Sequence, residues 1–82
     1  FPGFWVQDCS AATENILLAA HGKGIGAVWT AVYPVNERVD KVKSILDIPS
    51  YLIPLNVIGL GQPAEKKMPK DKWDPQRIMW FE

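Results

Sequence analysis

The stretch DCSAATENILLAAHGKGIGAVWTAVYP, residues 8–34, decides the fold that the sequence predicts. Over residues 11–20, small and apolar side chains fall on every side of a helical wheel, which is typical of a buried helix rather than a surface one. Residues 27–33 form an unbroken apolar run, which favours a strand covered on both faces. Pro34 ends that strand. The stretch therefore predicts a helix, a glycine-containing turn and a strand that all need cover.

Polar and glycine residues mark the expected ends of this helix. Asp8 or Ser10 is suited to cap its first turn, because a side-chain oxygen there can accept a backbone N–H bond. His21 falls in the last turn, and Gly22 is expected to end the helix in the left-handed conformation.

The residues that follow predict a second helix and a second strand. Asn36 is a suitable N-cap for an amphipathic surface helix over about residues 37–46. Residues 51–61 are apolar, but Pro54 cannot donate a hydrogen bond to a ladder, so strand pairing is expected to begin near Leu55.

The C-terminal end has a different character. Residues 62–76 hold three prolines and many charges with little periodicity, which predicts an extended arm lying on a surface. Residues 77–81 are apolar and predict a short last strand. The expected fold is therefore α+β, with two helices, two core strands and an extended arm that ends in a short strand.

The length of the chain conflicts with the amount of cover that these elements need. A chain of 82 residues buries roughly 60–65% of its unfolded surface and supports one modest core. This chain has a helix that is apolar all round, two strands that need cover on both faces, and four tryptophans. We therefore expect a companion segment of the same protein or a second subunit.

Charge and cysteine content exclude several classes of partner. Nine basic residues balance nine acidic ones, which argues against nucleic acid as a partner. No apolar run reaches the roughly 18 residues of a membrane span, so no membrane partner is expected. The single cysteine excludes an internal disulfide and favours a reducing compartment, the cytoplasm.

Three glycines, Gly22, Gly24 and Gly26, resemble a nucleotide-binding loop only superficially. A dinucleotide fingerprint runs from strand to glycines to a helix whose N-terminus meets the phosphates. Here the order is helix, glycines, strand. A helix cap followed by a tight turn is the favoured interpretation.

Neither a catalytic nucleophile nor a metal site is expected. Cys9 lies near the predicted helix start, but a nucleophile needs a base within hydrogen-bond reach. His21, the one histidine, lies twelve residues further along the same helix, about 18 Å away at 1.5 Å per residue. One histidine and one cysteine this far apart cannot form a metal site.

Four lysines crowd the predicted arm: Lys66, Lys67, Lys70 and Lys72. In an extended segment Lys70 and Lys72 point to the same side, because side chains alternate with period two. Two ammonium groups on one side could clamp a phosphate. A solvated basic arm is the alternative, and the charge pattern alone favours it.

Two segments together resemble the C-terminal half of FMN-dependent nitroreductase-like proteins. In that family a helix of the pattern D-x-[SA]-x-A-x-x-N-[IL]-L-L-A-A precedes G-x-G-x-x-W-[TI] and a strand, which DCSAATENILLAAHGKGIGAVWT matches. IGLGQPAEKKMPKDKWDP is similar to the family's last core strand and its G-x-P-x-E…P-K-[DS]-[KR] tail. The resemblance identifies residues 1–82 as the C-terminal part of a single domain.

The resemblance implies an FMN-dependent NAD(P)H oxidoreductase that works as an intertwined homodimer. Hydride would pass from NAD(P)H to N5 of FMN and then to a nitroaromatic, quinone or similar small-molecule acceptor. A short strand segment would line the isoalloxazine ring with a backbone N–H near N5: Trp29, Thr30, Ala31 and Val32. Lys70 and Lys72 match the basic pair that meets the FMN phosphate. The flavin supplies the chemistry, so no protein acid–base pair is required.

This sequence departs from the family pattern in two ways. The N-terminal half, with its R-x-S-x-R phosphate motif and long interface helix, is not in these 82 residues, so the companion segment is expected to supply it. Ala31 stands where some members have a glutamate beside the flavin. A non-catalytic α/β interaction module, whose basic arm binds a partner, is the alternative function.

Overall fold

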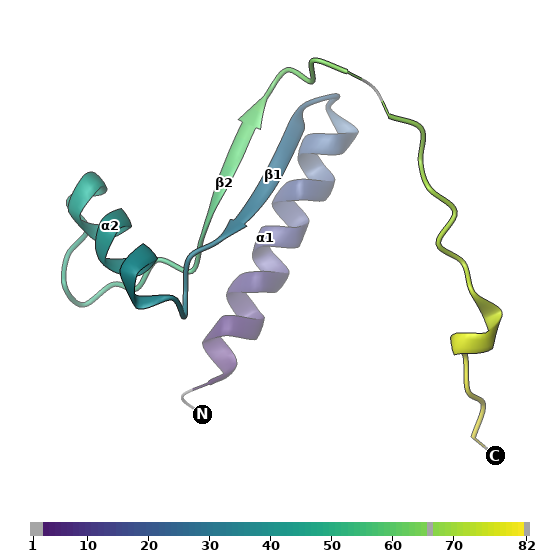
Figure 1. Ribbon diagram of the computed structural model, residues 1–82, viewed down its shortest axis with the longest axis horizontal. Coiled ribbons are helices and arrows are strands. Elements are labelled where there is room, and N and C mark those ends of the chain that lie inside the picture. The colour runs from purple at the N-terminus through teal and green to yellow at the C-terminus, as the bar shows by residue number, and fades with distance from the viewer. Residues whose placement is uncertain (1–2, 66, 82) are drawn as a thin grey trace.

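The computed structural model describes residues 3–65 and 67–81. Its elements in chain order are α1 (Phe4–Gly22), β1 (Gly26–Ala31), α2 (Asn36–Leu46), β2 (Asn56–Gly61) and a 3₁₀ turn, η1 (Pro75–Arg77). The two strands form an antiparallel sheet with α1 beside it, while α2 and the C-terminal end extend away (Figure 1). The predicted α+β fold with two helices and two core strands is confirmed.

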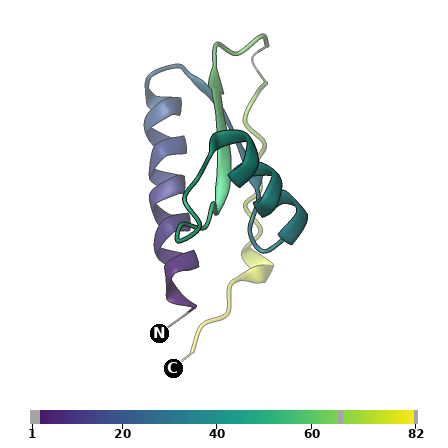
Figure 2. The same ribbon diagram turned by 90° about the vertical axis from the view of Figure 1, so that its left-hand side faces the viewer.

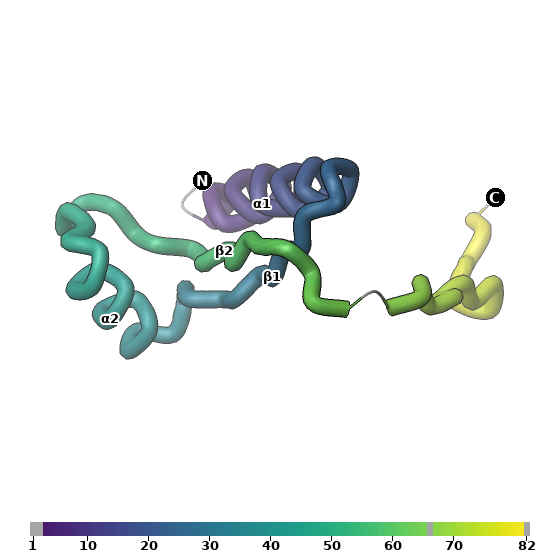
Figure 3. Tube along the Cα trace, turned by 90° about the horizontal axis from the view of Figure 1, so that it is seen from above, coloured from purple at the N-terminus to yellow at the C-terminus, as the bar shows by residue number. Residues whose placement is uncertain are grey.

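The register of the sheet decides which side chains share a face. Gly26 lies opposite Gly61, and Ala31 lies opposite Asn56. The Asn56 side-chain amide donates to the Thr13 hydroxyl of α1 at 2.9 Å, so the face that contains Asn56 is the one that α1 covers (Figure 2, Figure 3). Because side chains alternate along a strand, the opposite face carries Gly26, Val28, Thr30, Val57, Gly59 and Gly61.

α1 begins earlier than the sequence predicted. Gly3 is its N-cap residue, without a side-chain cap, so the expected caps at Asp8 and Ser10 are wrong. Residues 4–7 contain neither proline nor glycine, and Trp5 packs against Tyr33 with ring centroids 4.9 Å apart. This contact with the segment after β1 stabilises the extra first turn of α1.

The end of α1 is a Schellman motif, one glycine later than predicted. Gly22 is the last helical residue, and Gly24 takes the left-handed conformation at φ 73°. The Ile25 N–H donates to the Ala20 carbonyl at 2.9 Å and the Gly24 N–H donates to the His21 carbonyl at 3.0 Å, the two bonds that define the motif. The helix thus turns directly into β1.

The two strands are shorter than the apolar runs that predicted them. β1 ends at Ala31, three residues before Pro34, and β2 begins at Asn56, as expected from Pro54. Within the described chain only one face of the sheet is covered: α1 lies on that face, and Val28 on the other is 64% exposed. Cover for the second face, which the sequence analysis expects from a companion segment or a second subunit, stays a prediction.

α2 matches its predicted range, but its cap does not. Asn36 is the first helical residue and Val35 takes the N-cap position, so no side-chain cap bond forms. Asp47 ends the helix in the left-handed conformation at φ 53°. The Arg38 guanidinium donates to the Ala31 carbonyl at 3.0 Å, which ties α2 to the end of β1.

The C-terminal arm, residues 62–81 with 66 outside the described part, is exposed throughout and mostly extended, apart from η1. Figure 1 shows it leaving the end of β2 and running away from the sheet rather than over a surface of this chain. The last strand predicted for residues 77–81 is wrong: Arg77 closes the 3₁₀ turn and residues 78–81 are irregular. A strand needs a neighbouring strand, and the described chain offers none there.

The core is small for the amount of apolar chain. Only Thr13, Ala20 and Val32 are buried among the described residues, whereas Ile16 and Leu18 of α1 are 47% and 61% exposed. The radius of gyration is 16.8 Å, against about 12 Å for a compact chain of this length. The accessible surface is 7710 Å², against about 4,900 Å² for a folded monomer of this mass. The helix that the sequence predicted to be buried therefore has an uncovered side in this chain.

Candidate functional site

Three of the four predicted flavin-facing residues lie in the second half of β1, and Val32 follows directly after it. Trp29 pairs with Ile58, and Ala31 with Asn56, so both side chains lie on the α1 face. Thr30 lies on the opposite face. Val32 is 3% exposed, so its side chain belongs to the core and is closed to a ligand in this chain.

Some backbone N–H groups of residues 29–32 are hydrogen-bonded across the sheet, and others are not. The Val32 N–H donates to the Leu55 carbonyl at 3.1 Å, across the sheet. Bonded and non-bonded pairs alternate in an antiparallel ladder, so the Trp29 and Ala31 amides point to the edge of β1 away from β2. The Ala31 carbonyl points to the same edge, since it accepts a hydrogen bond from the Arg38 guanidinium there. No described strand occupies the edge, so these two N–H groups are the donors available to a ligand.

Lys70 and Lys72 lie in the C-terminal arm, and neither ammonium group has an ion-pair partner among the described residues. Asp71 between them accepts a hydrogen bond from the Trp73 N–H at 3.0 Å, which turns the arm locally. Both lysines are exposed. Among the described residues, the chain therefore presents two lysines without an ion pair, separated by one residue in sequence.

The two parts of the predicted site do not meet within one chain. The arm and β1 run apart in Figure 1, and the view from above in Figure 3 agrees. Residues 29–32 and Lys70 with Lys72 could share one ligand only if a second chain or further protein completes the site. Of the other two lysines, Lys67 pairs with Glu65 at 3.8 Å, and Lys66 lies outside the described residues.

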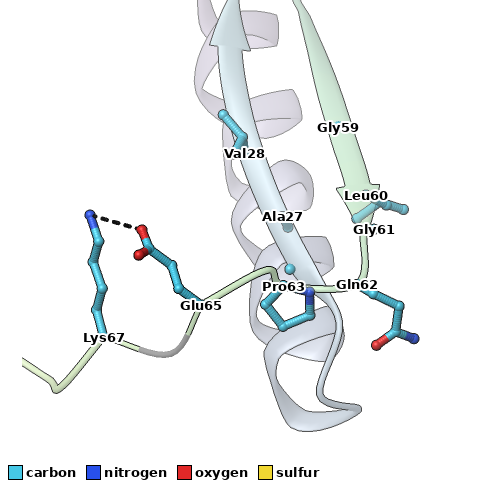
Figure 4. Close-up of a pocket in the computed structure, with 10 residues that line it drawn as sticks. Ala27, Val28, Gly59, Leu60, Gly61, Gln62, Pro63, Glu65 and Lys67 are labelled. Carbon is cyan, nitrogen blue, oxygen red and sulfur yellow. Dashed lines mark ion pairs between the residues drawn. The ribbon is translucent and has the colours of Figure 1, made fainter.

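An open groove of about 650 Å³ lies beside the first half of β1, and the sequence analysis did not identify it. Its lining includes Gly26, Val28, Gly59 and Gly61, with Pro63 and the Glu65–Lys67 pair at its border (Figure 4). The signal that could have revealed it is the pair of glycines, Gly59 and Gly61, in the second predicted strand, since glycine in a strand often marks a close approach.

The other candidate chemistries have no geometry to support them. Cys9 and His21 lie twelve residues apart on α1, as predicted, but because the helix begins at Phe4, Cys9 lies in its second turn and not at its start. Gly22, Gly24 and Gly26 join a helix to a strand, which is the predicted cap and turn and not a dinucleotide loop. The described residues contain no cluster of side chains suited to a metal ion. Neither described helix combines the length and apolar content needed to cross a membrane.

A model of the nitroreductase family matches residues 3–62, which include both helices and both strands. The chain belongs to the nitroreductase family. The resemblance stated from the sequence is thereby confirmed.

Relatives of this nitroreductase-family chain extend the match into the C-terminal arm. It is 57% identical over 77 residues to a protein of Methanothermobacter thermautotrophicus named "Putative NADH dehydrogenase/NAD(P)H nitroreductase", with 94% of this chain and 40% of that protein covered. A protein of the same name from Archaeoglobus fulgidus is 49% identical over 77 residues, with 90% of this chain and 44% of that protein covered.

A solved structure shows the same fold. The crystal structure of a protein of that name from Parabacteroides distasonis superposes with a TM-score of 0.88 at 48% identity, and covers 96% of this chain and 47% of that one. The nitroreductase-family chain described here therefore spans less than half the length of each of these relatives.

Proposed function

We propose that the chain is the C-terminal part of an FMN-dependent NAD(P)H oxidoreductase of the nitroreductase type. The family match over residues 3–62 carries the proposal. Bound FMN would accept hydride from NAD(P)H at N5 and reduce a nitroaromatic, quinone or similar acceptor, because the flavin brings this chemistry with it. The residues of the chain then have to bind the flavin, orient it and hold its charge.

The open edge of β1 fits a flavin ring. The Trp29 and Ala31 amides have no partner strand, so each is a donor that a ring nitrogen or carbonyl can satisfy. Ala31 has a small side chain, which permits a flat ring to approach the backbone closely. Trp29 and Thr30 flank this position on the two faces of the strand. Val32, whose amide and side chain are engaged within the chain, would support the segment from beneath.

Lys70 and Lys72 fit the phosphate of the same cofactor. A phosphate carries close to two negative charges at neutral pH, so two free ammonium groups match it in charge. Since the arm runs away from β1, the lysines that meet a given flavin would come from a second copy of the chain or be brought in by the assembled protein. The cofactor would then lie at an interface.

The partners that we propose are the N-terminal segment of the same protein and a second copy in a homodimer. The accessible surface exceeds that of a folded monomer by about 2,800 Å², which is the scale of an obligate interface. The single cysteine supports a cytoplasmic location. The balanced charge supports a small-molecule acceptor rather than nucleic acid.

A second candidate is a non-catalytic α/β interaction module, favoured by the full exposure of the basic arm. Flavin content separates the two functions. The protein assembled with its N-terminal segment should purify yellow and release one FMN per chain on denaturation, and NAD(P)H should bleach that colour. A colourless assembled protein that FMN cannot reconstitute would instead support the interaction module.

A further inference from the structure

Arg38 brings a positive charge to the open edge of β1. Its guanidinium Nη1 donates to the Ala31 carbonyl oxygen at 3.0 Å. The N–H and C=O of one strand residue point to the same side of the strand, so the guanidinium lies on the edge that the open Ala31 N–H faces. Arg38 forms no ion pair with a carboxylate among the described residues. A cation without a counter-ion therefore stands beside a donor that the proposed function assigns to the flavin.

The hydrogen bond to Ala31 does not by itself account for an arginine at this position. A carbonyl oxygen is a neutral acceptor, and the bond uses one of the five N–H groups of the guanidinium. The bond is exposed, so water could satisfy the same carbonyl at little cost. The bond orients the guanidinium but leaves its charge and most of its donors unused.

The place of Arg38 within α2 is unfavourable for a cation. Arg38 is the third residue of the helix, and the N-terminal end of a helix carries partial positive charge that repels a cation. Glu37, in the same turn, has the sign of charge that this end favours. The stability of α2 therefore gives no reason for Arg38, and its charge points to an anion outside the helix.

A flavin ring at residues 29–32 would supply that anion when it is reduced. Hydride transfer moves two electrons and one proton from NAD(P)H, which becomes NAD(P)⁺, to a neutral oxidised ring, which thereby gains one negative charge. A guanidinium beside the ring attracts the reduced form more strongly than the neutral oxidised form. Charge placed near the ring is one of the ways in which a protein tunes a flavin.

We propose that Arg38, held by the Ala31 carbonyl, sets its positive charge beside the flavin ring and stabilises the reduced cofactor. This rests on the proposed function, which lays the ring against residues 29–32. The role differs from that of Lys70 and Lys72, because the charge of the phosphate does not change when the ring is reduced. Those lysines should affect both redox states alike, whereas Arg38 should distinguish between them.

The reduction potential of bound FMN in the assembled protein tests the proposal. Arg38→Gln should lower the affinity for reduced relative to oxidised FMN by about tenfold, which lowers the two-electron midpoint potential by about 30 mV. Arg38→Met, which keeps most of the alkyl stem, should show the same shift, and Arg38→Lys, which keeps the charge, should show little. An unchanged potential for the two neutral variants in a protein that binds FMN would overturn the proposal.

Lys41 provides a matched control on the same helix. It is exposed and lies one turn beyond Arg38 on α2, so Lys41→Gln removes the same charge at a position further along the helix. The potential of this variant should equal that of wild type. Equal shifts for Lys41→Gln and Arg38→Gln would show that the effect comes from the total charge of the protein, and the proposal would fail.

Thermal melts separate this role from a purely structural one. Arg38 is exposed, so Arg38→Gln should change the Tm of the assembled protein by no more than about 2 °C. A large fall in Tm with an unchanged potential would show that Arg38 only ties α2 to β1, which contradicts the proposal.

Flavin content and the KM for NAD(P)H, recorded on the same samples, complete the test. An assembled wild-type protein that binds no FMN would overturn both this inference and the proposed function. A yellow protein whose potential does not depend on Arg38 would overturn this inference alone. A raised KM for NAD(P)H with an unchanged potential would assign the charge of Arg38 to the phosphates of the nicotinamide cofactor instead, and would likewise contradict it.

Discussion

The unit formed by α1, β1 and β2 differs from the C-terminal arm in what holds it in place. In the unit, a register of six residue pairs, a helix cap and the Thr13–Asn56 hydrogen bond connect elements that are far apart in sequence. In the arm, Trp80 and Phe81 are 85% and 87% exposed, and the side-chain hydrogen bonds and ion pairs among its described residues are all local. Both regions contain large exposed apolar side chains, so the presence of such residues does not by itself explain the difference.

The comparison shows where the missing contacts must come from. The unit has one covered face and one bare face, so it needs a further layer. The arm has no cover at all, so it needs a surface on which to lie. Burying exposed apolar surface stabilises a protein by roughly 25 cal/mol per Å². Covering the bare face and the arm therefore favours the assembled protein over the isolated chain. Substitutions in the two regions test this difference, and they are given in order of expected effect.

The largest effect is expected in the arm. Lys70→Ala or Lys72→Ala in the assembled protein should weaken FMN by about 10–150-fold, since a charge-assisted hydrogen bond contributes on the order of 1.5–3 kcal/mol. Riboflavin, which lacks the phosphate, should bind as before. Lys67→Ala is the control, because that lysine pairs with Glu65. Equal losses of affinity for FMN and for riboflavin would show that the lysines do not bind the phosphate and that the arm is a solvated run of charges.

The next effect is expected at the open edge of β1. Ala31→Trp should weaken FMN by about tenfold or more, because a bulky side chain prevents close approach of a ring to the backbone; the figure corresponds to about 1.4 kcal/mol. The circular dichroism spectrum should be unchanged. Ala27→Trp, on the same face of β1 but outside the segment, is the control. Unchanged flavin affinity and spectrum for Ala31→Trp would show that the flavin ring does not lie against residues 29–32.

A smaller effect, on stability, is expected inside the unit. Thr13→Val keeps the shape of the buried side chain but leaves the Asn56 amide without its acceptor, which should lower the free energy of unfolding by about 1–3 kcal/mol. Thr13→Ser retains the hydroxyl and should lose less. The measurement is chemical denaturation of the assembled protein. A Thr13→Val variant as stable as wild type would show that this bond does not hold α1 to β2.

The smallest effect is expected at the end of α1. Gly24→Ala forces a side chain into the left-handed conformation and should cost about 1 kcal/mol, whereas Gly22→Ala, at a helical position with open space, should be neutral or stabilising. Thermal melts of the two variants compare them directly. The reverse order would place the left-handed cap at Gly22, as the sequence alone predicted.

The sequence was a good guide where the signal is local. Pro54 placed the start of β2 near Leu55, and the apolar periodicity of residues 37–46 placed α2, since both depend on neighbouring residues only. Caps were less certain because several residues compete for one position. Gly24 rather than Gly22 takes the left-handed position, and Gly3 rather than Asp8 is the N-cap of α1. These choices depend on contacts such as Trp5–Tyr33 that cannot be read from the sequence.

Features that depend on distant chain were beyond the sequence. The last strand at residues 77–81 has the right composition, but a strand forms only against a neighbour. Which amides of residues 29–32 are open depends on the pairing with β2, so Val32 could not be separated from Ala31 in advance. The roles of these residues and of Lys70 and Lys72 toward a flavin stay predictions.

We propose that this chain carries two parts of one flavin site that only assembly brings together. The direct measurement is an FMN titration, by quenching of flavin fluorescence, of the 82-residue chain alone and of the same chain assembled with its N-terminal segment. We predict saturable binding of one FMN per chain in the assembled protein and no saturable binding to the chain alone. Equal affinity in the two titrations, or no binding in either, would contradict the account.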